Sequence, residues 1–152
     1  MQLSPHLSLA QLACSETAAQ RGIDNTPPPD VMENLKRLAA GLEEVQALLG
    51  APLEISSGYR CAALNEAVGG SRDSQHVLGL AADFVCPEFG NPLEIAHAIQ
   101  RSDIDFDQCI LEFGRWVHLS FSLLPRGRLL TIYDMNEGYL AGLWDADGNH
   151  LA

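Results

Sequence analysis

The order of its patterns predicts an α+β fold for this chain, with helices packed on a small, mainly antiparallel sheet. Helical patterns dominate the first half of the sequence, and strand-like segments follow one another near its end. One long amphipathic segment carries a single apolar stripe, which is typical of a helix that covers a sheet. A length of 152 residues suits one core, so we expect a single domain over residues 1–152.

The helices are predicted from their caps and their apolar spacing. Ser8 and Ser15 can each cap a short helix. The long helix is expected to have Asp30 as its cap and to end at Gly50, because Gly is typical of helix C-termini. Apolar residues recur within it at steps of three and four. They are Val31, Leu35, Leu38, Leu42, Val45 and Leu49.

The predicted strands are short apolar runs bounded by turn residues. One run, Leu80 to Cys86, carries a single charge, Asp83, in its middle. A charge in a buried strand is costly unless it is paired or used, so Asp83 needs an explanation. We also expect helices over 62–68 and 91–101, and strands over 53–56, 80–86, 108–113, 116–121, 129–133 and 139–144, the last four forming a meander.

Charge and hydropathy exclude two classes of partner. The formal net charge is −11, which repels a polyanion, so we expect no nucleic-acid partner. No apolar run approaches the roughly 18 residues that span a bilayer, so we expect no membrane insertion. The first residues lack a basic stretch followed by an apolar one, and we predict no secretory signal.

Several residues with metal-binding side chains are predicted to stay outside any site. The cysteines form no C-x-x-C pair, and we expect free buried thiols, with one disulfide left open. Three histidines near the termini or inside a helix are expected as non-ligands: His6, His97 and His150. An acidic run without a calcium-loop pattern is expected to form a solvated loop: Asp103, Asp105 and Asp107.

Three polar residues interrupt apolar strands or close a Gly-rich loop: His76, Asp83 and His118. If they converge, two imidazoles and a carboxylate make a three-ligand zinc site with a fourth position open for water. Each of them alone is also compatible with an ordinary hydrogen-bonded core residue. The spacing therefore leaves a purely structural His/Asp cluster as the alternative.

A predicted hairpin links His118 to an acid. Gly114 lies in a three-residue connection between two strands, and this would pair Glu112 with Trp116. Because side chains alternate along a strand, Glu112 and His118 would then project from one face of the sheet. Glu112 is therefore our candidate for the general base that activates a water.

The segment Ser74 to Asp83, S-Q-H-V-L-G-L-A-A-D, resembles the S-x-H-x-x-G-x-A-x-D signature of the zinc D-alanyl-D-alanine carboxypeptidase family. That family includes phage endolysin peptidases and, by fold, the hedgehog signalling domain. Trp116-Val117-His118 resembles its later W-x-H element. The resemblance extends over nearly the whole chain, looks phage-associated in the N-terminal half, and implies Zn²⁺ held by His76, Asp83 and His118.

One position departs from the pattern of many family members. They carry the catalytic acid three residues before the last His, where this chain has Arg115. Hedgehog-like and phage-type relatives use a longer spacing, which agrees with Glu112. Upstream, Ser57-Gly58-Tyr59-Arg60 resembles the segment whose Arg recognises substrate, so Arg60 is the expected substrate-binding residue, with a surface Arg after a turn as the alternative.

These resemblances imply a zinc metallopeptidase, a hydrolase that cuts peptide bonds in bacterial peptidoglycan. We favour an endolysin-like endopeptidase over a D-Ala-D-Ala carboxypeptidase, and a non-enzymatic, metal-bearing module of a phage particle is the third possibility. We expect a monomer that is made in the cytoplasm. It would act at the cell wall or periplasm after release, or as part of a phage particle.

Overall fold

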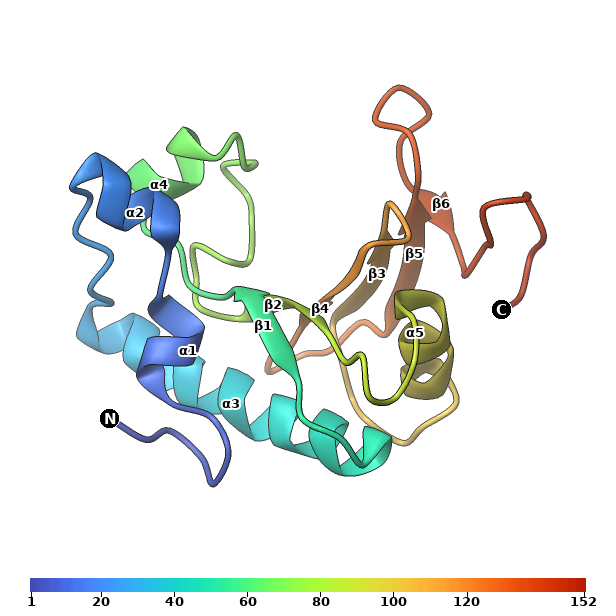
Figure 1. Cartoon of the computed structure of the whole chain (residues 1–152), viewed down its shortest axis with the longest axis horizontal. Helices are drawn as coiled ribbons and strands as arrows, with labels where there is room; N and C mark the ends of the chain where they lie inside the picture. The colour runs from blue at the N-terminus through green and yellow to red at the C-terminus, as the bar shows by residue number, and fades with distance from the viewer.

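The computed structural model describes all residues from Met1 to Ala152 and confirms the α+β prediction. Helices and strands fall into a mainly helical first part and a later sheet (Figure 1). The helices are α1 (Leu9–Ala13), α2 (Glu16–Arg21), α3 (Pro29–Leu49), α4 (Ala62–Ala67) and α5 (Pro92–Gln100). The strands are β1 (Glu54–Ser57), β2 (Ala81–Val85), β3 (Gln108–Glu112), β4 (Trp116–Ser120), β5 (Arg128–Ile132) and β6 (Leu140–Ala141).

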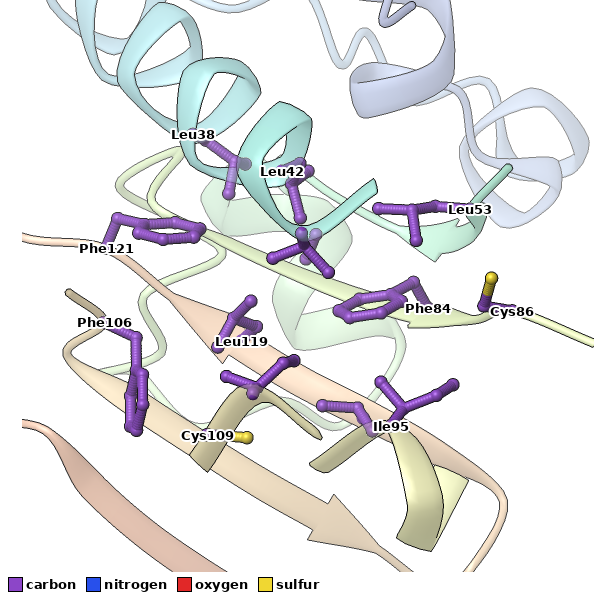
Figure 2. Packing of buried hydrophobic residues seen from close by; sticks show 14 of the residues in the cluster. Leu38, Leu42, Leu53, Phe84, Cys86, Ile95, Phe106, Cys109, Leu119 and Phe121 are labelled. Carbon is purple, nitrogen blue, oxygen red and sulfur yellow. The ribbon is translucent and has the colours of Figure 1, made fainter. Parts of the chain in front are cut away.

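Helix α3 covers one face of the sheet, as its apolar stripe predicts. Leu38 and Leu42 point from α3 toward Phe84 and Leu119 of the sheet (Figure 2). Helix α5 contributes Ile95 to the same core. Both helices therefore lie on one face, and the opposite face is left for other side chains. None of the helices is both long enough and apolar enough to cross a membrane.

The start of α3 differs from the prediction. The cap position is Pro28, which has no side chain that can make a capping hydrogen bond. Asp30 lies in the first turn of the helix. A proline at the first helical position has the φ angle that a helix needs, and this sets the start without a polar cap. Asp30 still carries the negative charge that a helix N-terminus favours.

The sheet has the strand order β1-β2-β4-β3-β5-β6, and every pair is antiparallel except β3 with β5. The predicted meander is therefore wrong after β4. After β4 the chain does not turn back beside that strand. It crosses the start of β3, and β5 pairs with the edge of β3 that is opposite β4. The predicted strand over 139–144 is reduced to β6, and Leu143 beyond it pairs with Leu151 and Ala152.

A buried carboxylate, Asp107, fixes this crossing. It accepts hydrogen bonds from the backbone N–H of Arg126 (3.1 Å) and from the guanidinium of Arg126 (2.9 and 2.7 Å). Gln75 donates a further bond of 2.7 Å from the loop before β2. Asp103 and Asp105 are exposed, as predicted, but the prediction of a solvated loop is wrong for Asp107, which is 2% exposed.

We expect Asp107→Asn to destabilise the fold at neutral pH by about 2 kcal/mol. Hydrogen bonds from Arg126, and then from Gln75, outweigh burial and lower the pKa of Asp107 to about 2. A lowered pKa stabilises the fold above the carboxyl pKa of the unfolded chain, roughly 4, and this stabilisation is lost as the pH falls toward about 2. The free energy of unfolding can be measured with urea at pH 7 and at pH 2.5. The difference between the variant and wild type should be smaller at pH 2.5.

The matched control for this variant is Asp105→Asn, which removes an exposed carboxylate two residues away. It should leave the free energy of unfolding unchanged at both pH values. If Asp107→Asn is as stable as wild type at pH 7, the network around Asp107 does not hold the crossing.

The four cysteines are free thiols, as predicted, and none of them forms a disulfide. Cys86 and Cys109 are buried in the core and Cys61 is partly buried, but Cys14 is exposed after α1, so the prediction of buried thiols is wrong for that residue. Burial raises the pKa of the Cys109 thiol to about 12, which keeps this side chain an inert, protonated core group.

Candidate metal centre and active-site cleft

Two neighbouring strands bring Asp83 and His118 together on the sheet face opposite α3. In the antiparallel ladder between β2 and β4, Asp83 lies directly across from His118. Val117 and Leu119 point to the core side, as the alternation predicts. His76 comes from the turns that precede β2. The structure thus brings the three predicted ligands to one place.

The three side chains are buried and close enough to share one ion. Asp83 Oδ1 lies 3.0 Å from His118 Nδ1 and 3.2 Å from His76 Nε2. The imidazole centroids are 5.0 Å apart, and one ligand atom from each residue lies within 4.8 Å of the others. This set could hold a metal ion, and two nitrogens with one carboxylate oxygen suit zinc.

The hydrogen bond of His76 supports a cation at this point. Its Nδ1 lies 2.7 Å from the carbonyl oxygen of Gly58, which can only accept, so Nδ1 carries the hydrogen. In a neutral imidazole, Nε2 then presents a lone pair to Asp83 Oδ1. Two facing lone pairs need a proton or a cation between them. A backbone carbonyl that orients a histidine in this way is also the usual outer partner of a metal ligand.

Asp83 is held in its ionised form. Burial raises its pKa, but the close contacts with His118 and His76 outweigh burial and hold the pKa of Asp83 well below its ordinary value. A charged carboxylate between two imidazoles is the ligand form that a divalent metal requires. The donor set therefore fits the zinc ion that the sequence predicted.

Gly58 can approach His76 because the segment after β1 is fixed against α1. A Cβ on Gly58 would lie 2.2 Å from the carbonyl oxygen of Leu12, so only glycine fits there. Asn25 ties the same segment down: its side chain donates to the carbonyl of Tyr59 (3.0 Å) and accepts from the N–H of Cys61 (2.8 Å). Sequence reasoning missed Asn25, because no local pattern marks a residue that bridges segments 34 positions apart.

Glu112 occupies the position that the hairpin predicted. It pairs with Trp116 across the β3–β4 turn, and Phe113 and Gly114 form this turn with φ angles of 58° and 66°. Trp116 Nε1 donates a hydrogen bond of 2.8 Å to Glu112 Oε1. Burial is the main cause that raises the pKa of Glu112 above the ordinary carboxyl value. A half-buried acid with a raised pKa is a typical proton acceptor in catalysis.

Arg60 lies in the same cleft, partly buried. Its backbone N–H donates to the carbonyl of His76 (3.1 Å), and its guanidinium donates to Ser74 Oγ (3.4 Å). Burial lowers the pKa of the guanidinium, and the charges of Asp83 and Glu112, which line the same cleft, oppose this. Its buried Nε has no hydrogen-bond partner within the chain.

A cleft of about 640 Å³ joins these groups. Trp116 forms part of its wall, whereas Tyr59 does not line it and belongs to the core. Tyr139 and Met135 also line the cleft, and sequence reasoning missed both, because they lie in a connection with no motif. His6, His97 and His150 lie outside the His76, Asp83 and His118 cluster, and His6 instead pairs with Glu43 at 2.9 Å.

Comparison with known families identifies the family of this chain. The family model described as Peptidase M15 matches residues 5–120, about three quarters of the chain. The chain belongs to the Peptidase M15 family. Every predicted ligand, Glu112 and Arg60 fall inside the matched segment. No curated protein matches the chain.

Membership confirms the resemblance to the zinc D-alanyl-D-alanine carboxypeptidase family and places the chain among peptidases, a class of hydrolases. The Peptidase M15 family is a metallopeptidase family, and the chain retains a His–Asp–His set that could bind its metal. The phage-associated branch stays a prediction.

Proposed function

We propose that the protein is a zinc-dependent peptidase that hydrolyses peptide bonds in bacterial peptidoglycan, with endopeptidase action favoured. The observation that carries this is the presence of Glu112 in one cleft with His76, Asp83 and His118. A site that only held a metal for stability would need no half-buried acid beside it. This disfavours a non-enzymatic module of a phage particle.

His76, Asp83 and His118 would hold the zinc, and Glu112 would move the proton. When bound, zinc supplies Lewis acidity, which activates water and polarises a peptide carbonyl. Glu112 takes a proton from the attacking water, whose oxygen bonds to the carbonyl carbon. As the C–N bond breaks, Glu112 returns this proton to the leaving nitrogen, so the products are a carboxylic acid and an amine. The raised pKa of Glu112 suits both transfers.

Arg60 would orient the substrate. Its guanidinium is anchored at Ser74 and Arg60 lines the cleft, so it can donate to a carbonyl or a carboxylate there. A terminal carboxylate would gain most from such a charged fork, and this favours the second candidate, a D-Ala-D-Ala carboxypeptidase. Val68 and Ser71 also line the cleft, and its volume of about 640 Å³ leaves room for chain on both sides of a scissile bond, which favours an endopeptidase.

The location and the oligomeric state of the protein follow from the same proposed function. We propose that it acts as a monomer on the peptide part of the cell wall, after release from the cytoplasm or as part of a phage particle. A net charge of −11 supports recognition through the cleft and not through adhesion to an anionic wall.

The deciding experiment digests purified peptidoglycan with the zinc-loaded protein and identifies the fragments by mass spectrometry. We expect cuts inside stem peptides or cross-links. A short peptide ending in D-Ala-D-Ala and its C-terminally amidated form are assayed in parallel, with wild type and Arg60→Lys. Lysine keeps the positive charge but lacks the planar, bidentate donors of a guanidinium, so we expect kcat/KM to be about tenfold lower on both peptides.

Arg115→Lys is the matched control, because Arg115 is exposed in the β3–β4 turn and should tolerate the change. If wild type cleaves only the free acid, and Arg60→Lys loses that preference, the carboxypeptidase assignment replaces the endopeptidase one. If no bond in peptidoglycan is cut, the proposed substrate is wrong.

A further inference from the structure

The connection between β5 and β6 lies beside the candidate base. Strand β5 runs parallel to β3, and its last residue, Ile132, is in register with Glu112. The N–H of Phe113 donates to the carbonyl of Ile132 (2.7 Å), which locks the two strand ends together. The following loop therefore leaves the sheet at the same end as the β3–β4 turn (Figure 1). This loop lies beyond residue 120, where the family match ends.

The loop has a defined shape that places Tyr139. Asp134 closes it, because its side chain accepts from the N–H of Asn136 (2.8 Å) and its carbonyl accepts from the N–H of Gly138 (3.0 Å). Gly138 has a φ angle of 76°, which turns the chain back toward the sheet. The next residue but one, Leu140, pairs with Thr131 across β5 and β6. Tyr139 is thus fixed between a turn and a strand.

Tyr139 is the one tyrosine that lines the cleft. Of the three tyrosines, Tyr59 is buried in the core and Tyr133 donates its hydroxyl to the carbonyl of Trp144 (2.9 Å). Tyr139 lines the cleft. Burial, and then the charges of Glu112 and Asp83, raise the pKa of its phenol, so the hydroxyl stays protonated as a neutral donor in the cleft that these two carboxylates also line. No hydrogen bond within the chain engages it.

A neutral donor at this place has a specific use in peptide hydrolysis. The scissile carbonyl must lie within reach of Glu112, which serves the attacking water. Its oxygen gains negative charge as the water adds, and donors aimed at that oxygen speed the reaction. Glu112 and Asp83 can only accept as carboxylates, and the donors of Arg60 belong to a charged group that is assigned to orienting the substrate. The phenol of Tyr139 is a neutral donor in the same cleft as the base.

We propose that Tyr139 positions the substrate of this cleft by donating a hydrogen bond from its phenol to the oxygen of the scissile carbonyl. This inference rests on the proposed peptidase function. It assigns a role in substrate cleavage to a loop outside the segment that the family model matches.

The test compares Tyr139→Phe with wild type on the peptidoglycan fragment that wild type cleaves best. The hydrogen bond from the phenol strengthens as negative charge develops on the carbonyl oxygen. We therefore expect kcat to fall at least tenfold while KM changes less than threefold. Tyr133→Phe is the matched control: it removes a hydroxyl that holds Trp144, outside the cleft, and should leave kcat unchanged. An unchanged kcat in Tyr139→Phe, or a rise in KM alone, would overturn the proposal.

A second measurement separates this proposal from the proposed function. In metal-free protein, the phenol titration of Tyr139 is the ultraviolet transition that Tyr139→Phe removes. We expect it above the ordinary tyrosine value of about 10, and lower in Glu112→Gln, where one negative charge is gone. If Glu112→Gln leaves this titration unmoved, the phenol does not lie near the base and the proposal is wrong, whatever the activity. An inactive wild type would overturn the peptidase function instead.

Discussion

Glu112→Gln is expected to lower kcat on peptidoglycan fragments by two orders of magnitude or more and to leave zinc bound. The amide keeps the size of the side chain and can still accept the 2.8 Å bond from Trp116, but it cannot take a proton from water. A general base usually contributes a factor of about 10² to 10⁴. Fragment release measured by mass spectrometry, together with elemental analysis of zinc, gives both quantities on one sample.

The control for this variant is Glu137→Gln, which changes an exposed acid in the loop before Tyr139. It should retain wild-type kcat, because its side chain does not line the cleft. Full activity in Glu112→Gln would mean that another group accepts the proton. Glu112 would then not be the general base, although it lies on the same sheet face as His118.

The face of the sheet that carries the site could be predicted because it depends on local rules. Strand alternation and a three-residue turn placed Glu112 and His118 on one face, and the structure pairs Glu112 with Trp116 as expected. Asp83 was marked by a charge in an apolar run, and it lies directly opposite His118. In each case the physical cause acts over a few residues, so the sequence displays it.

What could not be predicted depends on contacts between distant segments. The crossing to β5 is held by Asp107 and Arg126, 19 residues apart, and an acidic run gave no sign that one of its members would be buried. The position of Tyr139 follows from the parallel register of β5 with β3. Once the meander was assumed, no pattern could place that loop beside Glu112. Composition and periodicity carry no information about which distant segments pair with one another.

Removal of a metal ligand should have the largest effect. We expect wild type to bind about one zinc per chain, as one three-ligand site requires, and His118→Gln to bind it at least 100-fold more weakly. Loss of an outer partner of a metal ligand costs about 10- to 100-fold, so loss of a ligand should exceed that range. Elemental analysis after zinc reconstitution and dialysis measures the stoichiometry, and activity should fall with it.

A thermal readout distinguishes a metal site from a structural His/Asp cluster. A ligand that binds only the folded state raises Tm with its concentration, so zinc should raise the Tm of wild type and leave His118→Gln nearly unmoved. His97→Gln is the control, because His97 lies on α5, outside the cluster, and this variant should respond as wild type does. If the cluster is structural, His118→Gln would lower Tm equally with and without zinc, and wild type would hold no metal after reconstitution. That pair of results would remove the zinc site and, with it, the chemistry assigned to Glu112.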